Sequence, residues 1–515
     1  MNAEGAVHAQ QAADLGAATA APGDLKAGTR FFFHPGACLR RLAQQLSPTE
    51  GIRMQRLSGL DASFLYLETP SQPLHVCSIL EVDTCTVPGG YSFERLRDDL
   101  GARITSIPEF RQKLADNRLN LDHPAWVEDD TFDIDRHLHR IALPAPGGRA
   151  QLSDICGRIA SDPLDRSWPL WEMWVIEKFA GTDAQAAGRM VVMTKVHHAS
   201  VDGVTGADVL SRLCGTQPDM PPPEAVDGPG DASPMQLAVD GLARFATRPL
   251  RLATAVPATV STVVDFVRRA RSGRTMAAPF RAPRTPFNHA ITRRRIVAYA
   301  ELDLDDIKKV KNRFNVTVND VVMALCAGVL RRFLLDRGQL PEISLVATVP
   351  VSVHDKSDRP GRNQLSALFT RLQTQIADPA ERLRAIAHAT AVAKEHSAAI
   401  GATLLLDWAQ FATRTLLASV VRLYASTGLT RRPIHNVVIS NVPGPQIPLY
   451  FLGCELNAMY PLGPVFHGTG LNITVMSLTG RLDVGITSCW ELLPDVWELA
   501  DEFEVALQEL LAATP

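Results

Sequence analysis

The stretch that decides the fold is RMVVMTKVHHASVDG, at residues 189–203. Its first part is rich in strand-forming apolar residues, and a similar run, WEMWVIEKF at residues 171–179, precedes it across a turn containing Gly, Asp and Ala. Two such runs on either side of a turn predict an antiparallel pair of strands. The second strand leads directly into His197 and His198, and an apolar helical pattern follows. The sequence therefore predicts a histidine pair at a strand-to-helix junction.

This histidine pair suits acid–base chemistry. An imidazole at such a junction can project into a cleft, and an intrinsic pKa near ~6.5 lets it accept a proton from an attacking hydroxyl. On a helical turn Asp202 would share a face with His198 and could order the turn, while Gly203 would allow close backbone approach. The alternative interpretation is that both histidines are structural.

Other reaction types lack their motifs. A metal site through His198 and Asp202 would need a third ligand at a usable spacing, which is absent together with HExxH, so we expect no metal. A serine hydrolase would need a GxSxG turn or a similar element, and none occurs. The missing nucleophile motif favours direct transfer between substrates over a covalent enzyme intermediate.

Composition narrows the class of protein. A chain of 515 residues favours two domains, and 46% apolar with 21% charged residues is typical of a globular protein. A net charge of -3 argues against a nucleic-acid partner. Eight scattered cysteines without a CxxC pair fit a reducing compartment. The N-terminus lacks the pattern of a signal peptide, and the best apolar run, 399–425, is interrupted by charges, so membrane contact would be peripheral.

The chain divides by composition into four parts. Residues 1–53 show no sustained period and predict a poorly ordered extension, and residues 54–215 form an N-terminal domain that carries the histidine pair. Residues 216–290 begin with a Pro/Gly/Asp-rich linker and continue as a connector helix, and residues 291–515 form a C-terminal domain. Between residues 235 and 275 the sequence has seven arginines and only two aspartates. This basic segment could rest on anionic headgroups or serve as a solvated connector.

Both domains mix strands with helices, which predicts an α/β or α+β fold with one sheet in each half. Apolar alternation predicts strands at 75–82, 295–302, 343–351, 436–440, 471–478 and 482–487. Apolar helical spacing predicts helices at 92–100, 304–314, 318–337, 399–425 and 491–511.

At this point the sequence resembles a known family. HHxxxDG at residues 197–203 is the active-site motif of the CoA-dependent acyltransferase superfamily, which includes chloramphenicol acetyltransferase, plant BAHD transferases and peptide-synthetase condensation domains. Further motifs are similar to those of the bacterial wax ester synthase/diacylglycerol acyltransferase family, in the family's order, and only the leading extension departs. These are LSGLDASFLYLETP at 57–70, PLWE at 169–172, VNDV at 318–321, PVSV at 350–353 and SNVPGP at 440–445.

The resemblance implies two chloramphenicol-acetyltransferase-like domains, each a mixed sheet flanked by helices, with a tunnel between them. Acyl-CoA would enter on one side and the acceptor alcohol on the other. His198 would deprotonate the hydroxyl, and His197 would support its ring. Asp202 would pair with an arginine as a structural element beside Gly203, which replaces the interpretation that Asp202 orients His198.

The activity implied is acyl-CoA-dependent O-acyl transfer that makes triacylglycerol from diacylglycerol, with no cofactor beyond the co-substrate acyl-CoA. Wax ester synthesis from a long-chain fatty alcohol is the close alternative. A noncatalytic lipid-binding or lipid-droplet protein on the same scaffold is a further one. The expected location is cytoplasmic, peripherally attached to the inner face of the plasma membrane or to lipid droplets.

Two pairs of polar residues are candidates near the tunnel. Asn319 and Asp320 precede an apolar helix in the arrangement of an N-cap, and the family motif places them as shaping residues. Asn472 and Thr474, in the strand-like run GLNIT, are candidate donors to the thioester oxyanion.

Two further motifs have simpler structural interpretations. The run 169–171, PLW, is expected to be a turn followed by an aromatic core anchor rather than a catalytic element. Ser440 and Asn441 open a run of Pro and Gly that predicts a rigid turn after a strand, and we place them at the tunnel.

Overall fold

The computed structural model describes residues 55–115, 122–179, 188–200, 212–226, 281–352, 365–400 and 432–513, with parts of 235–277 and 411–430. Contacts divide the chain into Met1–Gly51 and Ile52–Pro515, and every described residue belongs to the second unit. The extension predicted at 1–53 lies outside the described residues, as does most of the basic connector. The predicted domain boundaries stay predictions.

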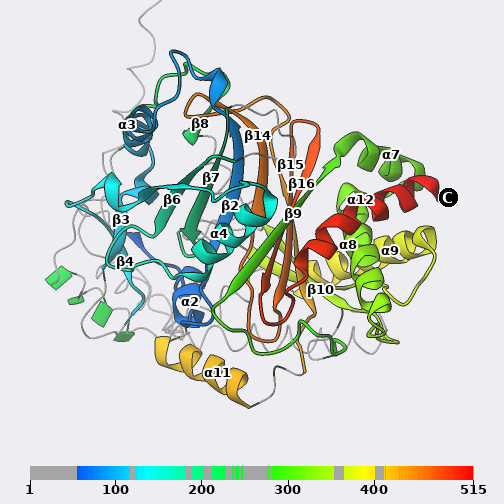
Figure 1. Cartoon of the computed structure of the whole chain (residues 1–515). Coiled ribbons are helices and arrows are strands. Elements are labelled where there is room, and N and C mark those ends of the chain that lie inside the picture. Colours follow the sequence, from blue (N-terminus) through cyan, green and yellow to red (C-terminus); the bar gives the residue numbers. More distant parts are fainter. Residues whose placement is uncertain are drawn as a thin grey trace, which may run out of the picture. The chain divides into compact units, whose positions relative to one another are not determined.

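The first sheet has seven strands in the order β5-β6-β7-β2-β14-β13-β8 (Figure 1). Strands β6 and β7 are antiparallel neighbours, and β7 is also antiparallel to β2, which confirms the strand pair predicted beside the histidines. Strand β5 runs parallel to β6, so the sheet is mixed. The strands are β2 (His75–Asp83), β5 (Leu138–Ala142), β6 (Trp171–Glu177), β7 (Arg189–His197), β8 (Cys214–Gly215), β13 (Tyr450–Phe451) and β14 (Cys454–Leu462).

The second sheet has six strands in the order β11-β10-β12-β15-β16-β9. It is also mixed, because β12 runs parallel to both β10 and β15 while the other neighbours are antiparallel. The strands predicted in the second half of the sequence are therefore confirmed, with shifted ends. They are β9 (Arg295–Asp303), β10 (Val346–Ser352), β11 (Leu365–Arg371), β12 (Val437–Pro443), β15 (Leu471–Leu478) and β16 (Arg481–Cys489).

Helices flank both sheets. Figure 1 shows α7, α8, α9 and α12 grouped around the second sheet, and their apolar side chains share one core with its strands. Helix α3 packs its leucines on the first sheet, whereas α4 contacts both β2 and β9. A small sheet, β1-β4-β3, lies in the first half (Gln55–Arg56, Ala125–Glu128 and Gln112–Ala115). The helices are α2 (Gly59–Leu67), α3 (Phe93–Ile104), α4 (Arg149–Ser161), α7 (Leu304–Phe314), α8 (Val318–Asp336), α9 (Pro379–Ile400), α11 (Arg414–Ser426) and α12 (Val496–Ala512).

The single helix predicted over 399–425 is wrong. Helix α9 ends at Ile400, and α11 begins only at Arg414, after the non-helical Thr413. Asp378 accepts a hydrogen bond from the Glu381 amide at 2.7 Å, which caps the start of α9.

Strand β14 joins the two sheets. It pairs with β2 in the first sheet although it comes from the second half of the sequence, and it also contacts β15 and β16 of the second sheet. The approach is close, because a Cβ on Gly485 of β16 would overlap the backbone carbonyl of Pro461 in β14. Tyr299 of β9 and Tyr460 of β14 stack with ring centroids 4.4 Å apart. The core of one half is therefore completed by strands from the other.

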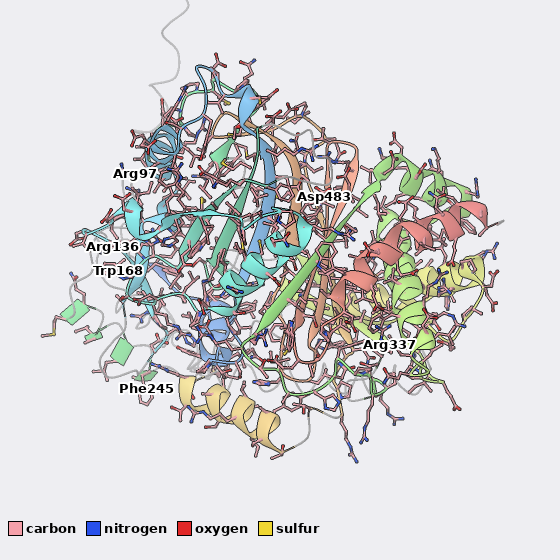
Figure 2. All side chains as sticks on the ribbon, viewed as in Figure 1. Arg97, Arg136, Trp168, Phe245, Arg337 and Asp483 are labelled. Atoms are coloured by element: carbon pink, nitrogen blue, oxygen red, sulfur yellow. The ribbon has the colours of Figure 1, made fainter. Side chains whose placement is uncertain are left out.

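A buried carboxyl at this junction makes stability depend on pH. Asp483, labelled in Figure 2, is fully buried, and its carboxylate accepts the Met459 amide at 2.8 Å. Burial raises the pKa of Asp483 to about 7, although the Met459 amide opposes the change, and burial likewise raises the pKa of Glu81 to about 7. The carboxylates of Glu301 and Glu81 also raise the pKa of Asp483.

We expect Asp483→Asn to stabilise the fold in mildly alkaline solution. Unfolded carboxyls ionise near ~pH 4, so between that pH and about 7 the folded state holds protons that the unfolded state has lost, and stability falls as pH rises. Removing this ionisation should raise the free energy of unfolding by about 2–4 kcal/mol near pH 8 and change it little near pH 4. Urea denaturation at both pH values measures this, with surface Asp501→Asn as the control. Equal or lower stability of Asp483→Asn near pH 8 would contradict the prediction.

Candidate active site

The histidine pair lies where β7 ends. His197 is the last residue of β7 and is buried, whereas His198 begins the following turn and is half-buried. The amide of His197 donates to the Leu170 carbonyl at 2.9 Å, and the amide of His198 donates to the Leu74 carbonyl at 2.9 Å. The backbone is thus held by the segments that precede β6 and β2. The imidazole of His198 is not sealed in the interior, as a base that meets a substrate requires.

Hydrogen bonding determines the tautomer of His197. The Ala199 amide donates to His197 Nδ1 at 3.0 Å, so that nitrogen carries no proton. The proton is therefore on Nε2, which lies 3.4 Å from Glu68 Oε2, a distance longer than a good hydrogen bond. Arg166 contacts the same carboxylate oxygen at 2.5 Å. Burial would raise the pKa of Glu68, but His197 and Arg166 outweigh it and lower the pKa to about 2, so the carboxyl is an anion.

The ring of His198 stacks on Phe64. Their centroids are 4.1 Å apart and the planes differ by 9°. Phe64 belongs to α2, which the motif at 57–70 builds: Ser58 caps the helix by accepting from the Asp61 amide at 3.1 Å, and Asp61 accepts from the Ser58 amide at 3.2 Å. The motif is therefore a capped helix that carries an aromatic ring to the histidine.

Sequence reasoning missed Phe64 and Glu68 as functional residues. Both lie in the motif at 57–70, four residues apart, a spacing that places side chains on one side of a helix. That spacing was visible in the sequence. Their contact with a strand more than a hundred residues later was not.

The PLWE motif is structural, as predicted for Trp171. Its indole is buried, donates to the Phe110 carbonyl at 2.8 Å and stacks on His137 with centroids 4.5 Å apart. The next residue, Glu172, accepts from Lys195 Nζ at 3.1 Å, and that lysine is only 1% exposed. Lys195 and His197 are two apart on β7, so their side chains point to the same face of the first sheet.

The predicted N-cap at Asn319 and Asp320 needs correction, because Thr317 is the N-cap of α8. Asp320 lies inside the first turn, where its carboxylate accepts from the Thr317 amide at 3.0 Å and from the hydroxyl at 2.7 Å. Thr317 and Asp320 thus form a capping box whose N-cap lies two residues before Asn319. Asn319 is half-buried beside it. Their shaping of a tunnel stays a prediction.

The rigid turn predicted at 440–445 is also corrected. Strand β12 continues to Pro443, so Ser440 and Asn441 lie in the strand, and Ser440 is paired with Thr474 of β15. The Thr474 hydroxyl donates to Asn472 Oδ1 at 2.8 Å, and Asn472 Nδ2 donates to the Pro464 carbonyl at 3.0 Å. The structure thus places the histidine pair at the first sheet, these four residues in the second sheet, and Asn319 with Asp320 in the first turn of α8.

The remaining predicted residues, Asp202 and Gly203, lie outside the described residues, so their roles stay predictions. Within the described part of the chain, no group of three His, Cys, Asp or Glu side chains could hold a metal ion. In that same part, no helix has the length and apolar character needed to cross a membrane.

Comparison with known proteins decides the family. Residues 57–322 match the wax ester synthase/diacylglycerol acyltransferase catalytic domain, and residues 362–511 match the WS/DGAT C-terminal domain. The chain belongs to the WS/DGAT family. A Mycobacterium tuberculosis H37Rv protein, provisionally named a diacylglycerol O-acyltransferase, is 58% identical to this WS/DGAT chain over 490 residues, which are 94% of this chain and 96% of the relative.

Solved structures agree with this assignment. The wax ester synthase/diacylglycerol acyltransferase from Marinobacter aquaeolei VT8 is 30% identical, with a TM-score of 0.62 over 88% of this WS/DGAT chain and 98% of that chain. The starter condensation domain of rhizomide synthetase is 14% identical, with a TM-score of 0.51 over 90% of this chain and 95% of that one, and shows the fold alone. The predicted family and the two-domain, mixed α/β fold class are therefore confirmed, and the protein is an acyltransferase of this family.

Proposed function

We propose that this WS/DGAT protein transfers a long acyl chain from acyl-CoA to diacylglycerol and so makes triacylglycerol. The observation that carries the proposal is the half-buried imidazole of His198, stacked on Phe64 at the end of β7. The mycobacterial relatives named after this activity support diacylglycerol as the acceptor. A long-chain fatty alcohol, which would give a wax ester, is the second candidate, supported by the Marinobacter relative's name.

The reaction is a direct displacement. His198 takes the proton of the acceptor hydroxyl as its oxygen attacks the thioester carbonyl, and a tetrahedral oxyanion forms. The intermediate then expels the CoA thiolate, which takes the proton back from the imidazolium and leaves as free CoA. The step needs no cofactor or metal beyond the co-substrate acyl-CoA, and in this proposal Asp202 and Gly203 have a structural role at the active site.

Asn472 is the better candidate to stabilise the oxyanion. Thr474 has a single hydroxyl proton, which is donated to Asn472. The amide of Asn472 carries two N–H groups, and its bond to Pro464 uses one. In this proposal Ser440, Asn441, Asn319 and Asp320 shape the tunnel around the reacting groups.

The acceptor is tested by direct product analysis. Purified protein is incubated with oleoyl-CoA and either diacylglycerol or hexadecanol, and thin-layer chromatography resolves the products. We expect triacylglycerol as the main ester. Wax ester alone would establish the alternative acceptor, and no ester with either acceptor would support a noncatalytic lipid-binding protein.

We also propose peripheral contact with the cytoplasmic face of a membrane or with a lipid droplet, through α11. Val420 and Leu423, three apart on one face of this helix, are 52% and 59% exposed. Arg414 and Arg422 lie on the same helix, which has no acidic residue. Exposed apolar groups beside cations fit an anionic lipid surface. Helix α11 also contacts α2, the helix that carries Phe64.

The double substitution Val420→Glu/Leu423→Glu is therefore expected to weaken binding to phosphatidylglycerol vesicles by at least about tenfold, because it removes apolar burial and adds repulsion. Vesicle flotation at low salt measures this. The matched control, Leu335→Glu/Val505→Glu, alters two exposed apolar residues on α8 and α12 and should bind like the unaltered protein. Equal loss in both variants would contradict a role for α11.

A further inference from the structure

Helix α2 and its C-cap residue place one side chain beside each imidazole of the histidine pair. Phe64 stacks on His198, and Glu68, the C-cap of the same helix, faces His197. We propose that Phe64 and Glu68 are positioning residues for the transfer reaction, Phe64 by fixing the plane of the His198 ring and Glu68 by fixing the proton of His197 and the backbone of His198. This inference rests on the proposed role of His198 as the base.

Phe64 restricts how the His198 ring can turn. A stack at 4.1 Å with planes 9° apart is close contact over a whole ring face. Rotation of the imidazole out of this plane would drive its edge into the phenyl ring. Since the nitrogen lone pairs lie in the imidazole plane, holding the plane limits the directions from which a hydroxyl proton can be accepted. A small error in that direction is costly, because a base acts only within hydrogen-bond reach.

Glu68 acts on both histidines through its two oxygens. Oε2 lies 3.4 Å from His197 Nε2 and so favours the tautomer with a proton there. Oε1 accepts from the Leu74 amide at 3.2 Å, and the Leu74 carbonyl in turn accepts from the His198 amide at 2.9 Å. The buried carboxylate of Glu68 therefore favours one tautomer of His197. It also holds the backbone of Leu74, to which the His198 amide is hydrogen-bonded.

The anion at Glu68 is itself held in place. Arg166 Nη2 bonds both the carboxylate and the Leu65 carbonyl, at 2.5 and 2.8 Å, so it ties the charge to the end of α2. An anion that is only 8% exposed needs such partners, because an unpaired buried charge is strongly unfavourable. Its charge also favours the protonated form of nearby imidazoles, which is the form His198 takes during transfer.

Steady-state kinetics with full-length protein, oleoyl-CoA and the acceptor that yields product test both residues across about pH 5.5–9. For Phe64→Leu we expect kcat to fall at least about tenfold with the KM for acyl-CoA within about twofold, and Phe64→Tyr to recover most of that loss. For Glu68→Gln we expect a similar fall in kcat. In addition, the acid limb of the kcat/KM profile should move to lower pH, since the variant lacks the buried anion beside His197.

Two matched variants control for general damage. Phe132 stacks on His137 with centroids 5.4 Å apart, and Glu177 pairs with Arg140 at 3.0 Å, so these residues make the same two kinds of contact with other partners. Phe132→Leu and Glu177→Gln should keep the unaltered kcat and pH profile. Thermal unfolding shows which variants fold.

The outcomes distinguish the positioning roles of Phe64 and Glu68 from the proposed role of His198 as the base. If Phe64→Leu and Glu68→Gln keep the full kcat and pH profile while His198→Ala is inactive, the positioning inference is wrong and the proposed function stands. If His198→Ala stays active, the proposed base itself is wrong. Should Glu68→Gln fail to fold, the Phe64 pair decides alone, because equal kcat of Phe64→Leu and the unaltered protein would overturn the inference.

Discussion

His198→Ala should lower kcat by about 100- to 10,000-fold, the usual contribution of a general base. The KM for acyl-CoA should stay within about threefold, because the substitution leaves the backbone bond from His198 to Leu74 in place. Folding should be little affected, since the side chain is half-buried rather than part of the core. The loss is then a loss of chemistry rather than of structure.

Initial rates of ester formation from radiolabelled acyl-CoA measure this effect. His139→Ala is the matched control, because His139 also contacts an aromatic ring, Trp174, with centroids 4.3 Å apart, but lies on β5. It should keep nearly full activity. A purified, folded His198→Ala protein with unaltered rates would remove the general base from the mechanism.

Gly485→Ala should be among the most destabilising single substitutions in this protein. The added methyl group would overlap the Pro461 carbonyl, and both atoms belong to strands held on each side by neighbours. Neither strand can move without breaking pairing, with β2 in one sheet or with β9 and β15 in the other. We expect a loss of more than about 4 kcal/mol in the free energy of unfolding.

The urea concentration at the unfolding midpoint and the yield of folded protein measure this loss. Gly101→Ala is the control, because a methyl group there would meet only the Ile134 side chain at 3.6 Å, in ordinary contact. Alanine also favours the helix α3 by about 1 kcal/mol over glycine, so the control should be as stable as the unaltered protein or more. An unchanged midpoint for Gly485→Ala would show that the two strands are not closely packed.

Local patterns predicted most of the elements near the site. Strand β7 and its neighbour β6 were visible because apolar, strand-forming residues run directly into His197. Helix α8 was visible from its long apolar pattern, and its start at Val318 was predicted correctly. Its N-cap was misassigned, because Asn319, Asp320 and Thr317 are all good capping residues and only the backbone shows which one caps.

Long-range neighbours could not be predicted. A strand's alternation shows which of its faces is buried but not which strand pairs with it, so nothing local placed β14 beside β2. The same holds for the stack of Phe64 on His198, which depends on how α2 docks against the end of β7. The helix predicted over 399–425 failed differently, because the long apolar run did not show that α9 ends at Ile400 and α11 begins at Arg414.

The position of β14 has a consequence during translation. The strands that carry the histidine pair leave the ribosome early, but the partner of β2 begins at Cys454, near the end of a 515-residue chain. At about 5–20 residues per second, β2 would present an open edge for on the order of tens of seconds. Open edges recruit other strands, so nascent chains of this protein should depend on chaperones. Fragments that stop before Cys454 should aggregate even though they contain both histidines.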